Sequence, residues 1–352
     1  MNDMADHSIL LSLPRPQKPL PPRKEGGKGR FESFADMVKD AWKDDDTPPT
    51  HAWIRYSLSA GIPLDSFIDR FRSISGIKHA FGLRVFVHPV RVDHHEIEHE
   101  DFDHLTNPET GGYEIEVNYR KKRCDGGTHF FFAVESDAQE KQKTNSRGLD
   151  ALNALEALIR ISLGAMTVVD TRRTSHVDLG TGLIHDAVPS HHAYGPTELP
   201  RCDEASLRSA IELAEASAKA APQVAGRLAL GMRWADMAFK EHDLLAFWTA
   251  IEVLADRRGH GVYQVFTKAY GMQPNKAQKL AKRLGLDVIC QMRGNLAHDG
   301  VPVYLDPAGA SYLNTLIHDL TRYVAGLPCL ELAKKAIDGH KIEAWIKCSR
   351  DY

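Results

Sequence analysis

Two side chains near the C-terminal end of the sequence have types and spacing that suit acid–base chemistry beside a phosphate. Arg293 and His298 are separated by four residues, in a stretch that ends with Asp299 and Gly300. An imidazole titrates near pH 6.5 and can take or give a proton at neutral pH. A guanidinium keeps its charge and holds phosphate oxygens through two N–H donors. This spacing is common by chance, so the pair indicates a functional site only if the secondary-structure elements that carry it support one.

These elements are predicted to be helices. Apolar residues recur at intervals of three and four from Leu286 to Ala297 and, upstream, from Asp243 to Ala255. Short links with Gly or Pro separate them from their neighbours, which is typical of an antiparallel helical bundle. Further helices are predicted over residues 207–221, 227–240, 276–284 and 312–325.

Two groups of residues in this bundle resemble the HEPN superfamily, in particular the helical domain of ApeA-like proteins. Those proteins pair a helix that reads aromatic-x-x-x-Glu-x-Leu with a later helix that reads Arg-x4-His-x-Gly. The matching residues are Trp248, Glu252 and Leu254, then Arg293, His298 and Gly300. The resemblance covers residues 227–327, under a third of the chain.

The resemblance implies a homodimeric ribonuclease that needs no metal or cofactor, in which two Arg/His pairs face one cleft. His298 would take the proton from a ribose 2′-hydroxyl, and Arg293 would stabilise the charge that builds on the phosphate oxygens. The product would carry a 2′,3′-cyclic phosphate. Glu252 and Asn295 are implied as supporting residues, and stress response or phage defence as the setting.

One position departs from the pattern of the active members, which usually place a polar residue directly after the arginine. Gly294 stands there, and Asn295 follows it. Because each helical residue turns by 100°, Asn295 points away from the direction that a side chain at Gly294 would take.

A non-catalytic interpretation stays open. Arg293 and His298 lie in the last turns of their predicted helix, where cations favour the negative end of the dipole, before a glycine stop. There they would cap the helix and pair with Glu252 or Asp299. The protein would then be a HEPN-like accessory or interaction protein, for example of a metabolic operon such as methylamine utilisation.

A literal His-Glu-x-x-His motif from His95 to His99 offers a metal-dependent hydrolase as a weaker alternative. In zinc enzymes this motif lies on a helix, so that both imidazoles share one face. Residues 93–104 are almost all polar and continue directly from an alternating strand pattern that begins at Leu83. We therefore expect a solvated loop here and no resident metal.

Four basic residues are predicted to form the tip of a β-hairpin and are candidates for binding substrate RNA: Arg120, Lys121, Lys122 and Arg123. Residues 113–119 alternate as a strand does, residues 129–134 form a second strand, and two glycines lie between them. Basic residues beside the Phe130–Phe132 run could grip single-stranded RNA. The plainer interpretation is a solvated turn above phenylalanines that alternate into the core.

The bulk composition is that of a globular intracellular protein. The 352 residues are 43% apolar and 26% charged, and the formal net charge is -3. RNA binding would therefore need a local basic patch, and neither DNA nor a membrane is an expected partner. Five scattered cysteines without a C-x-x-C pair indicate a reducing compartment. With an acidic start and no apolar run of bilayer length, the predicted location is cytoplasmic.

We predict an α+β protein in three parts. Residues 1–50 form a disordered Pro-rich leader and a short helix. Residues 51–202 form a mixed α+β domain with a small antiparallel sheet, covered by an amphipathic helix that begins near Leu149. Residues 203–345 form the all-helical HEPN-like domain.

Overall fold

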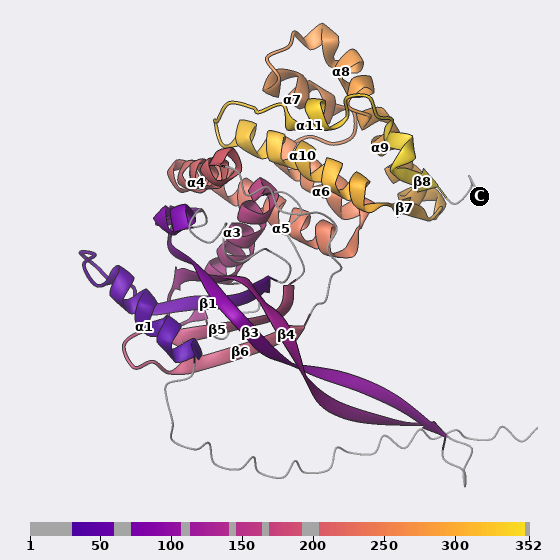
Figure 1. Cartoon of the computed structure of the whole chain (residues 1–352). Coiled ribbons are helices and arrows are strands. Elements are labelled where there is room, and N and C mark those ends of the chain that lie inside the picture. Colours follow the sequence, from indigo (N-terminus) through magenta and orange to yellow (C-terminus); the bar gives the residue numbers. More distant parts are fainter. Residues whose placement is uncertain are drawn as a thin grey trace, which may run out of the picture.

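A computed structural model of the chain describes residues 30–59, 72–106, 113–140, 146–163, 169–191 and 204–348. They form an α+β fold, as predicted, with a six-stranded antiparallel sheet in the N-terminal part and helices in the C-terminal part. Figure 1 shows the helical part stacked on one side of the sheet. The predicted leader, apart from its last residues, lies outside the described residues.

The sheet has the strand order β2-β3-β4-β1-β5-β6, and every neighbouring pair is antiparallel. Its strands are β1 (His51–Ser59), β2 (His79–Ala80), β3 (Leu83–Thr106), β4 (Tyr113–Ser136), β5 (Val169–Asp178) and β6 (Ile184–His191). The central strand β1 therefore joins the β3–β4 hairpin to the β5–β6 hairpin.

Both faces of the sheet are covered. Helix α3 (Arg147–Leu163) packs on one face, and α1 (Arg30–Trp42), the predicted short helix, packs on the other. Because successive strand residues point to opposite faces, Phe130 and Phe132 lie on the α3 side and Phe131 on the α1 side, all three buried. The prediction that this run alternates into the core is confirmed, and its rings are not available to stack on bases.

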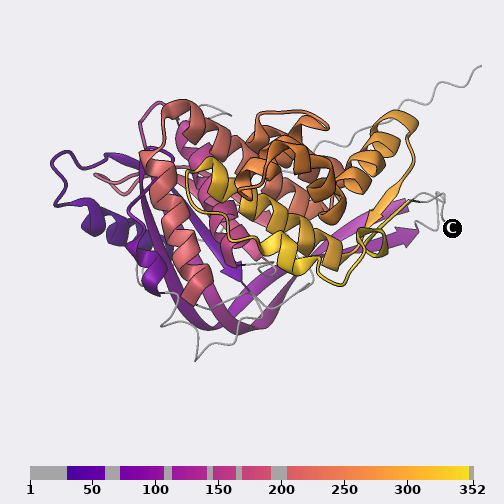
Figure 2. The same ribbon diagram turned by 90° about the horizontal axis from the view of Figure 1, so that it is seen from above.

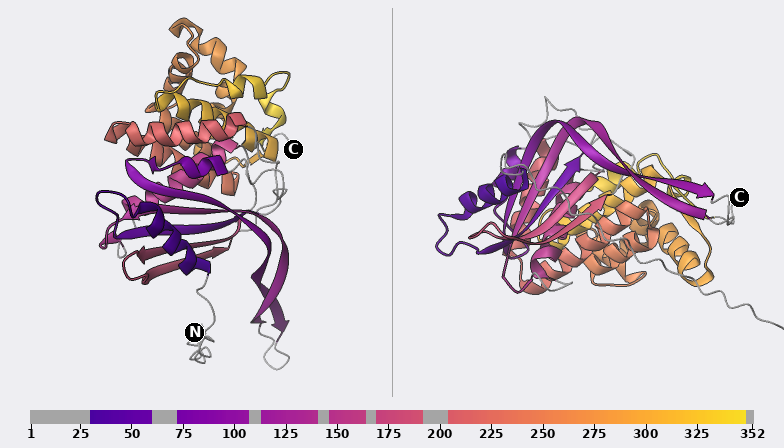
Figure 3. Two further views of the ribbon diagram at one scale, coloured as in Figure 1. Left: turned by 60° about the vertical axis from the view of Figure 1, so that its left-hand side comes forward. Right: turned by 90° about the horizontal axis from the view of Figure 1, so that it is seen from below.

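Strands β3 and β4 extend beyond the rest of the sheet as a two-stranded ribbon. Their register is continuous from Val85↔Val134 to Thr106↔Tyr113, whereas β1 pairs only with residues 130–136 of β4. Figures 1 and 3 show the ribbon projecting from the body of the molecule. The predicted turn between residues 119 and 129 is therefore wrong, because those residues run through the middle of β4.

The register of the ribbon overrides the glycine signal, because Gly127 pairs with Val92 within the continuous β3–β4 ladder. Glu96 is the partner of Arg123 in this ladder, and Glu98 is the partner of Lys121. The expectation of a loop at residues 95–99 is also wrong, because these residues belong to β3. Along a strand, His95 and His99 are about 13 Å apart rather than about 6 Å along a helix, so the zinc-enzyme geometry is not formed.

The helical part begins at residue 204. Its longer helices are α4 (Glu204–Lys219), α5 (Pro222–Glu241), α6 (Leu244–Ala255), α7 (Gly261–Ala269), α8 (Ala277–Arg283), α9 (Leu286–Asp299) and α10 (Pro307–Val324). Short elements complete it: α11 (Leu332–Ala336) and a small sheet of β7 (Val303–Leu305) and β8 (Ile346–Cys348). Figure 2, seen from above, shows these helices gathered over the sheet. None of the described helices is both long and apolar enough to cross a membrane.

Local signals set the helix boundaries. The Asp243 carboxylate accepts the backbone N–H of Leu245 at 2.8 Å and caps α6, while the Asp306 carboxylate accepts that of Gly309 at 2.7 Å and caps α10. Pro222 occupies the first turn of α5, where its missing N–H costs nothing. These signals lie within a few residues of the sequence, which is why the helices were predictable.

One buried core runs from the sheet into the helical part. Helix α3 packs against β1 and β4 on one side and against α4, α5 and α10 on the other. Two ion pairs cross these contacts, Arg55 with Glu156 between β1 and α3, and Arg160 with Asp236 between α3 and α5. The predicted boundary near residue 202 separates strands from helices along the sequence, but α3 belongs to the core of both parts.

Candidate functional site

Helix α9 carries the predicted Arg/His pair. Leu286 and Ile289 are buried and anchor its first turns, whereas residues from 290 onward are half-buried or exposed. The helix ends at Gly300, which has a φ of 64° and donates its N–H to the carbonyl of Asn295. A positive φ favours glycine, so this residue terminates the helix as predicted.

Arg293 is half-buried and His298 is exposed. Among the described residues, neither side chain has a hydrogen bond or ion pair, so the pairing that the capping interpretation predicts is not formed there. Five residues along a helix correspond to a rise of about 7.5 Å and a turn of about 140°. The two side chains of one copy therefore leave α9 in different directions.

Glu252 on α6 makes a different contact from the one predicted. Its Oε1 accepts the backbone N–H of Gly259 at 2.8 Å. The carboxylate thus holds the loop between α6 and α7, residues 256–260, which carries Arg257 and Arg258. It stays close to α9 all the same, because α6 packs against α9.

The Cys290 thiol marks where α6, α7 and α9 meet. Burial raises the pKa of Cys290, the Tyr263 hydroxyl and the Arg293 charge oppose that shift, and the Glu252 charge adds to it. Burial and the neighbouring Cys290 also raise the pKa of Tyr263 above its usual value. Arg293 and Glu252 therefore lie near the same thiol, and Cys290 is protonated at neutral pH.

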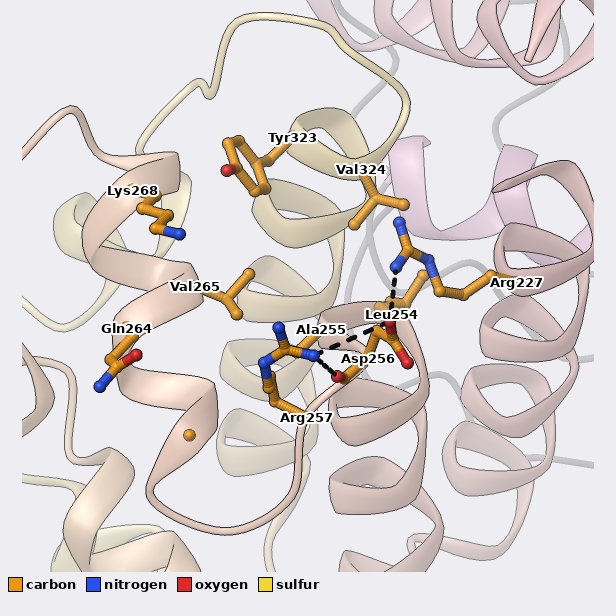
Figure 4. A pocket seen from close by; sticks show the side chains of 11 residues that line it. Arg227, Leu254, Ala255, Asp256, Arg257, Gln264, Val265, Lys268, Tyr323 and Val324 are labelled. Atoms are coloured by element: carbon orange, nitrogen blue, oxygen red, sulfur yellow. Dashed lines mark hydrogen bonds and ion pairs between the residues drawn. The ribbon is translucent and has the colours of Figure 1, made fainter. Parts of the chain in front are cut away.

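An open groove of about 740 Å³ lies beside Glu252, between α5, α6 and the loop that follows α6. Three arginines line it, namely Arg227, Arg257 and Arg258. A smaller cavity of about 370 Å³ lies between this loop, α7 and α10, and Figure 4 shows Arg227, Arg257 and Lys268 around it. This is a local basic patch of the kind that RNA binding by a net acidic chain requires.

Asp256 is the acidic partner within this patch. Its Oδ2 lies 3.6 Å from an Arg227 guanidinium nitrogen and 3.9 Å from one of Arg257 (Figure 4). Such partly exposed pairs contribute about 0–1 kcal/mol. Both arginines can therefore exchange Asp256 for a phosphate at little cost.

The other predicted RNA contacts lie elsewhere. Arg120 to Arg123 form part of β4, paired with residues 96–99 of β3, rather than a turn. Figure 1 shows the ribbon leaving the sheet on the side away from the helical part. The fold brings Glu252 together with the groove arginines Arg227, Arg257 and Arg258, whereas Arg120 to Arg123 belong to the β3–β4 ribbon.

Sequence reasoning missed a cluster of three histidines at one end of the sheet: His51, His176 and His185. His176 is fully buried, and its Nε2 lies 2.9 Å from the Ser136 hydroxyl. Burial, and then the neighbouring His51 and His185, lower the pKa of His176 to about 4, so it is neutral at physiological pH. These residues come from different strands, and no local spacing indicates their meeting.

No family model, curated protein or solved structure matches the chain. The fold and the site together define an α+β protein with an arginine-lined groove in its helical part. The resemblance to HEPN domains rests on the residues of α6 and α9 quoted above.

Proposed function

We propose that the protein is a metal-independent, HEPN-type endoribonuclease that acts as a cytoplasmic homodimer. The observation that carries the proposal is the state of Arg293, which is half-buried and lacks an ion pair among the described residues. Its charge and that of Glu252, which lines the arginine-lined groove, both act on the Cys290 thiol. A cation held in this way is ready to bind an anion from outside the chain.

The geometry of α9 favours a dimeric site. Arg293 and His298 of one helix diverge by about 140°, so both cannot reach one phosphate from the same side. In a symmetric dimer that brings two α9 helices together, the His298 of one copy can face the Arg293 of the other. His298 would then take the 2′-hydroxyl proton, and Arg293 would stabilise the phosphate oxygens.

The groove supplies the contacts that hold the RNA. Arg227, Arg257 and Arg258 can each bind a backbone phosphate, while Glu252 fixes the loop that carries two of them. Glu252 is thus a positioning residue. A supporting role for Asn295 rests on the HEPN resemblance alone.

The test is cleavage of mixed RNAs by the purified full chain in EDTA. Arg293→Ala and His298→Ala are compared with wild type and with two matched controls at exposed positions, Arg283→Ala on α8 and His79→Ala on β2. We expect the α9 variants to lose at least about 100-fold in rate, the usual scale for an acid–base or charge-stabilising group. Equal cleavage by all five proteins would place the activity elsewhere or in a contaminant.

A second variant set separates binding from chemistry. Arg257→Ala and Arg258→Ala should weaken RNA binding and reduce the salt dependence of the affinity by about one phosphate contact each, while bound RNA is still cleaved at the wild-type rate. Loss of cleavage without loss of affinity would remove the groove from the binding role.

The non-catalytic alternative is favoured by one specific feature. Gly294 stands where active HEPN members carry a polar residue, and a Cβ built at Gly294 meets no atom within 4 Å. A polar side chain would therefore fit, and its absence is not imposed by packing. If wild type is silent and Gly294→Asn cleaves RNA in EDTA, the natural protein is a HEPN-like accessory protein whose site has lost one group.

A further inference from the structure

Metal-type ligands meet at the end of the sheet, far from α9. His51 is the first residue of β1 and pairs directly with Asp178, the last residue of β5. His185 is the second residue of β6. One ligand atom from each of the three lies within 4.8 Å of the other two.

The backbone around the cluster is held by hydrogen bonds. The turn between β5 and β6 is closed by Asp178, whose N–H donates to the Leu183 carbonyl at 3.0 Å. The same turn is tied to the start of β1, because the Leu179 N–H donates to the Thr50 carbonyl at 2.9 Å. The three ligand positions are therefore fixed relative to one another by the sheet itself.

Two of the ligands have partners that orient them as metal ligands are usually oriented. The Thr50 hydroxyl lies 2.9 Å from Nδ1 of His51, which fixes the ring and leaves Nε2 available as a ligand atom. Oδ1 of Asp178 accepts the backbone N–H groups of Gly180 and Thr181 at 2.8 and 3.1 Å, which fixes the orientation of the carboxylate.

The third ligand is His185, and one of its ring nitrogens has no hydrogen-bond partner. Nε2 of His185 is buried and has no hydrogen-bond partner. A buried polar nitrogen without a partner costs about 1–3 kcal/mol and calls for an explanation. A metal bond to Nε2 would supply that partner.

The donor set and its surroundings suit a first-row transition metal. Two imidazoles and one carboxylate are typical zinc ligands, with bonds of about 2.0–2.2 Å and a fourth position for water. A tetrahedron of that size has edges of about 3.3 Å, so the side chains need to move by only about an ångström. The buried His176 ring adjoins the cluster, with its centroid 5.4 Å from that of His51 and 5.9 Å from that of His185.

We propose that His51, Asp178 and His185 bind a divalent first-row transition metal, with Zn²⁺ as the first candidate and one position open to solvent or substrate. The ion would tie the β5–β6 turn to the start of β1. This site is separate from the EDTA-resistant chemistry proposed for α9, so either proposal can fail without the other.

The experiment titrates Co²⁺ into the full chain and follows the visible absorption of four-coordinate cobalt, with Zn²⁺ added afterwards to displace it. His51→Gln, His185→Gln and Asp178→Asn are compared with wild type and with His340→Gln, an exposed histidine of the helical part. Because the three ligand variants keep every histidine outside the cluster, background binding to those histidines is common to them and to wild type. Wild type and the control should bind one tight equivalent, and the three ligand variants should bind it at least about 100-fold more weakly.

A milder variant protects the test against misfolding. Thr50→Val keeps all three ligands and removes only the hydroxyl that orients His51, so Co²⁺ affinity should fall by about 10–100-fold with an unchanged fold by circular dichroism. The proposal is overturned if wild type takes up no tight equivalent of Co²⁺ or Zn²⁺. It is equally overturned if folded His185→Gln or Asp178→Asn binds Co²⁺ as wild type does.

Discussion

Removing the carboxylate of Glu156 should destabilise the protein more than any surface change. Arg55 and Glu156 are each only 6% exposed, and their side chains form an ion pair of 2.7 Å between β1 and α3. Arg55 also donates to Asn153 at 2.7 Å and to Thr174 at 2.9 Å, so it is fixed in place. Glu156→Ala would remove the carboxylate of this buried ion pair, at a cost of about 3–5 kcal/mol.

The assay is urea unfolding at pH 7 followed by far-ultraviolet circular dichroism. At an m-value of about 3 kcal/mol/M, that loss lowers the midpoint by roughly 1–1.7 M urea. The matched control is Glu204→Ala, which breaks the exposed pair of Glu204 with Arg208 on α4 and should cost no more than about 0.5 kcal/mol.

A double variant completes the test. Arg55→Met with Glu156→Leu replaces both charges by apolar groups of similar size, and it should recover most of the stability lost in Glu156→Ala. If Glu156→Ala costs no more than Glu204→Ala, the pair does not couple β1 to α3 as the contacts indicate. The reasoning about a single core through α3 would then be wrong.

Two further predictions concern packing and thiol chemistry. Gly226→Ala and Gly231→Ala lie in the same helix, α5, yet thermal unfolding should show opposite effects. At Gly226 nothing lies within 4 Å of a new Cβ, so the free energy of unfolding should rise by about 0.5–1 kcal/mol. At Gly231 the new Cβ would lie 2.6 Å from Leu254, so the free energy of unfolding should fall by about 1–3 kcal/mol. Equal effects of the two substitutions would contradict the close approach of α5 to α6. Burial and the nearby Asp319 charge raise the pKa of Cys329 from 9.0 to about 12. Alkylation of Cys329 near pH 8, measured by peptide mass spectrometry, should therefore be about 1,000-fold slower than that of an ordinary thiol, and its rate should rise about tenfold per pH unit. An alkylation rate equal to that in the unfolded chain would refute the raised pKa.

The helices were predictable because their signals are local. Asp243 caps α6, Pro222 opens α5 and Gly300 ends α9, each within one turn of the helix it bounds. Helix α7 was not predicted because it has only nine residues and follows Gly259 closely, although Val262, Val265 and Phe266 recur at helical spacing.

The β-ribbon and the sites depend on contacts that sequence spacing does not show. The Gly126–Gly127 pair predicted a turn, but residues 119–129 run through β4 in continuous register with β3. Arg293 and His298 could be found because they share one helix. The metal-type ligands could not, since His51 and Asp178 are brought together only by the pairing of β1 with β5.

The central claim is that α9 directs cleavage by the ribose 2′-hydroxyl. The most direct measurement uses two RNAs of the same sequence, one unmodified and one with 2′-O-methyl groups throughout. Each RNA is incubated with the full chain in EDTA, and the ends of the products are analysed. We expect that only the unmodified RNA is cut, that its fragments end in 2′,3′-cyclic phosphate, and that Arg293→Ala and His298→Ala abolish the cut. Cleavage of the methylated RNA, or fragments with free 3′-hydroxyl ends, would contradict it.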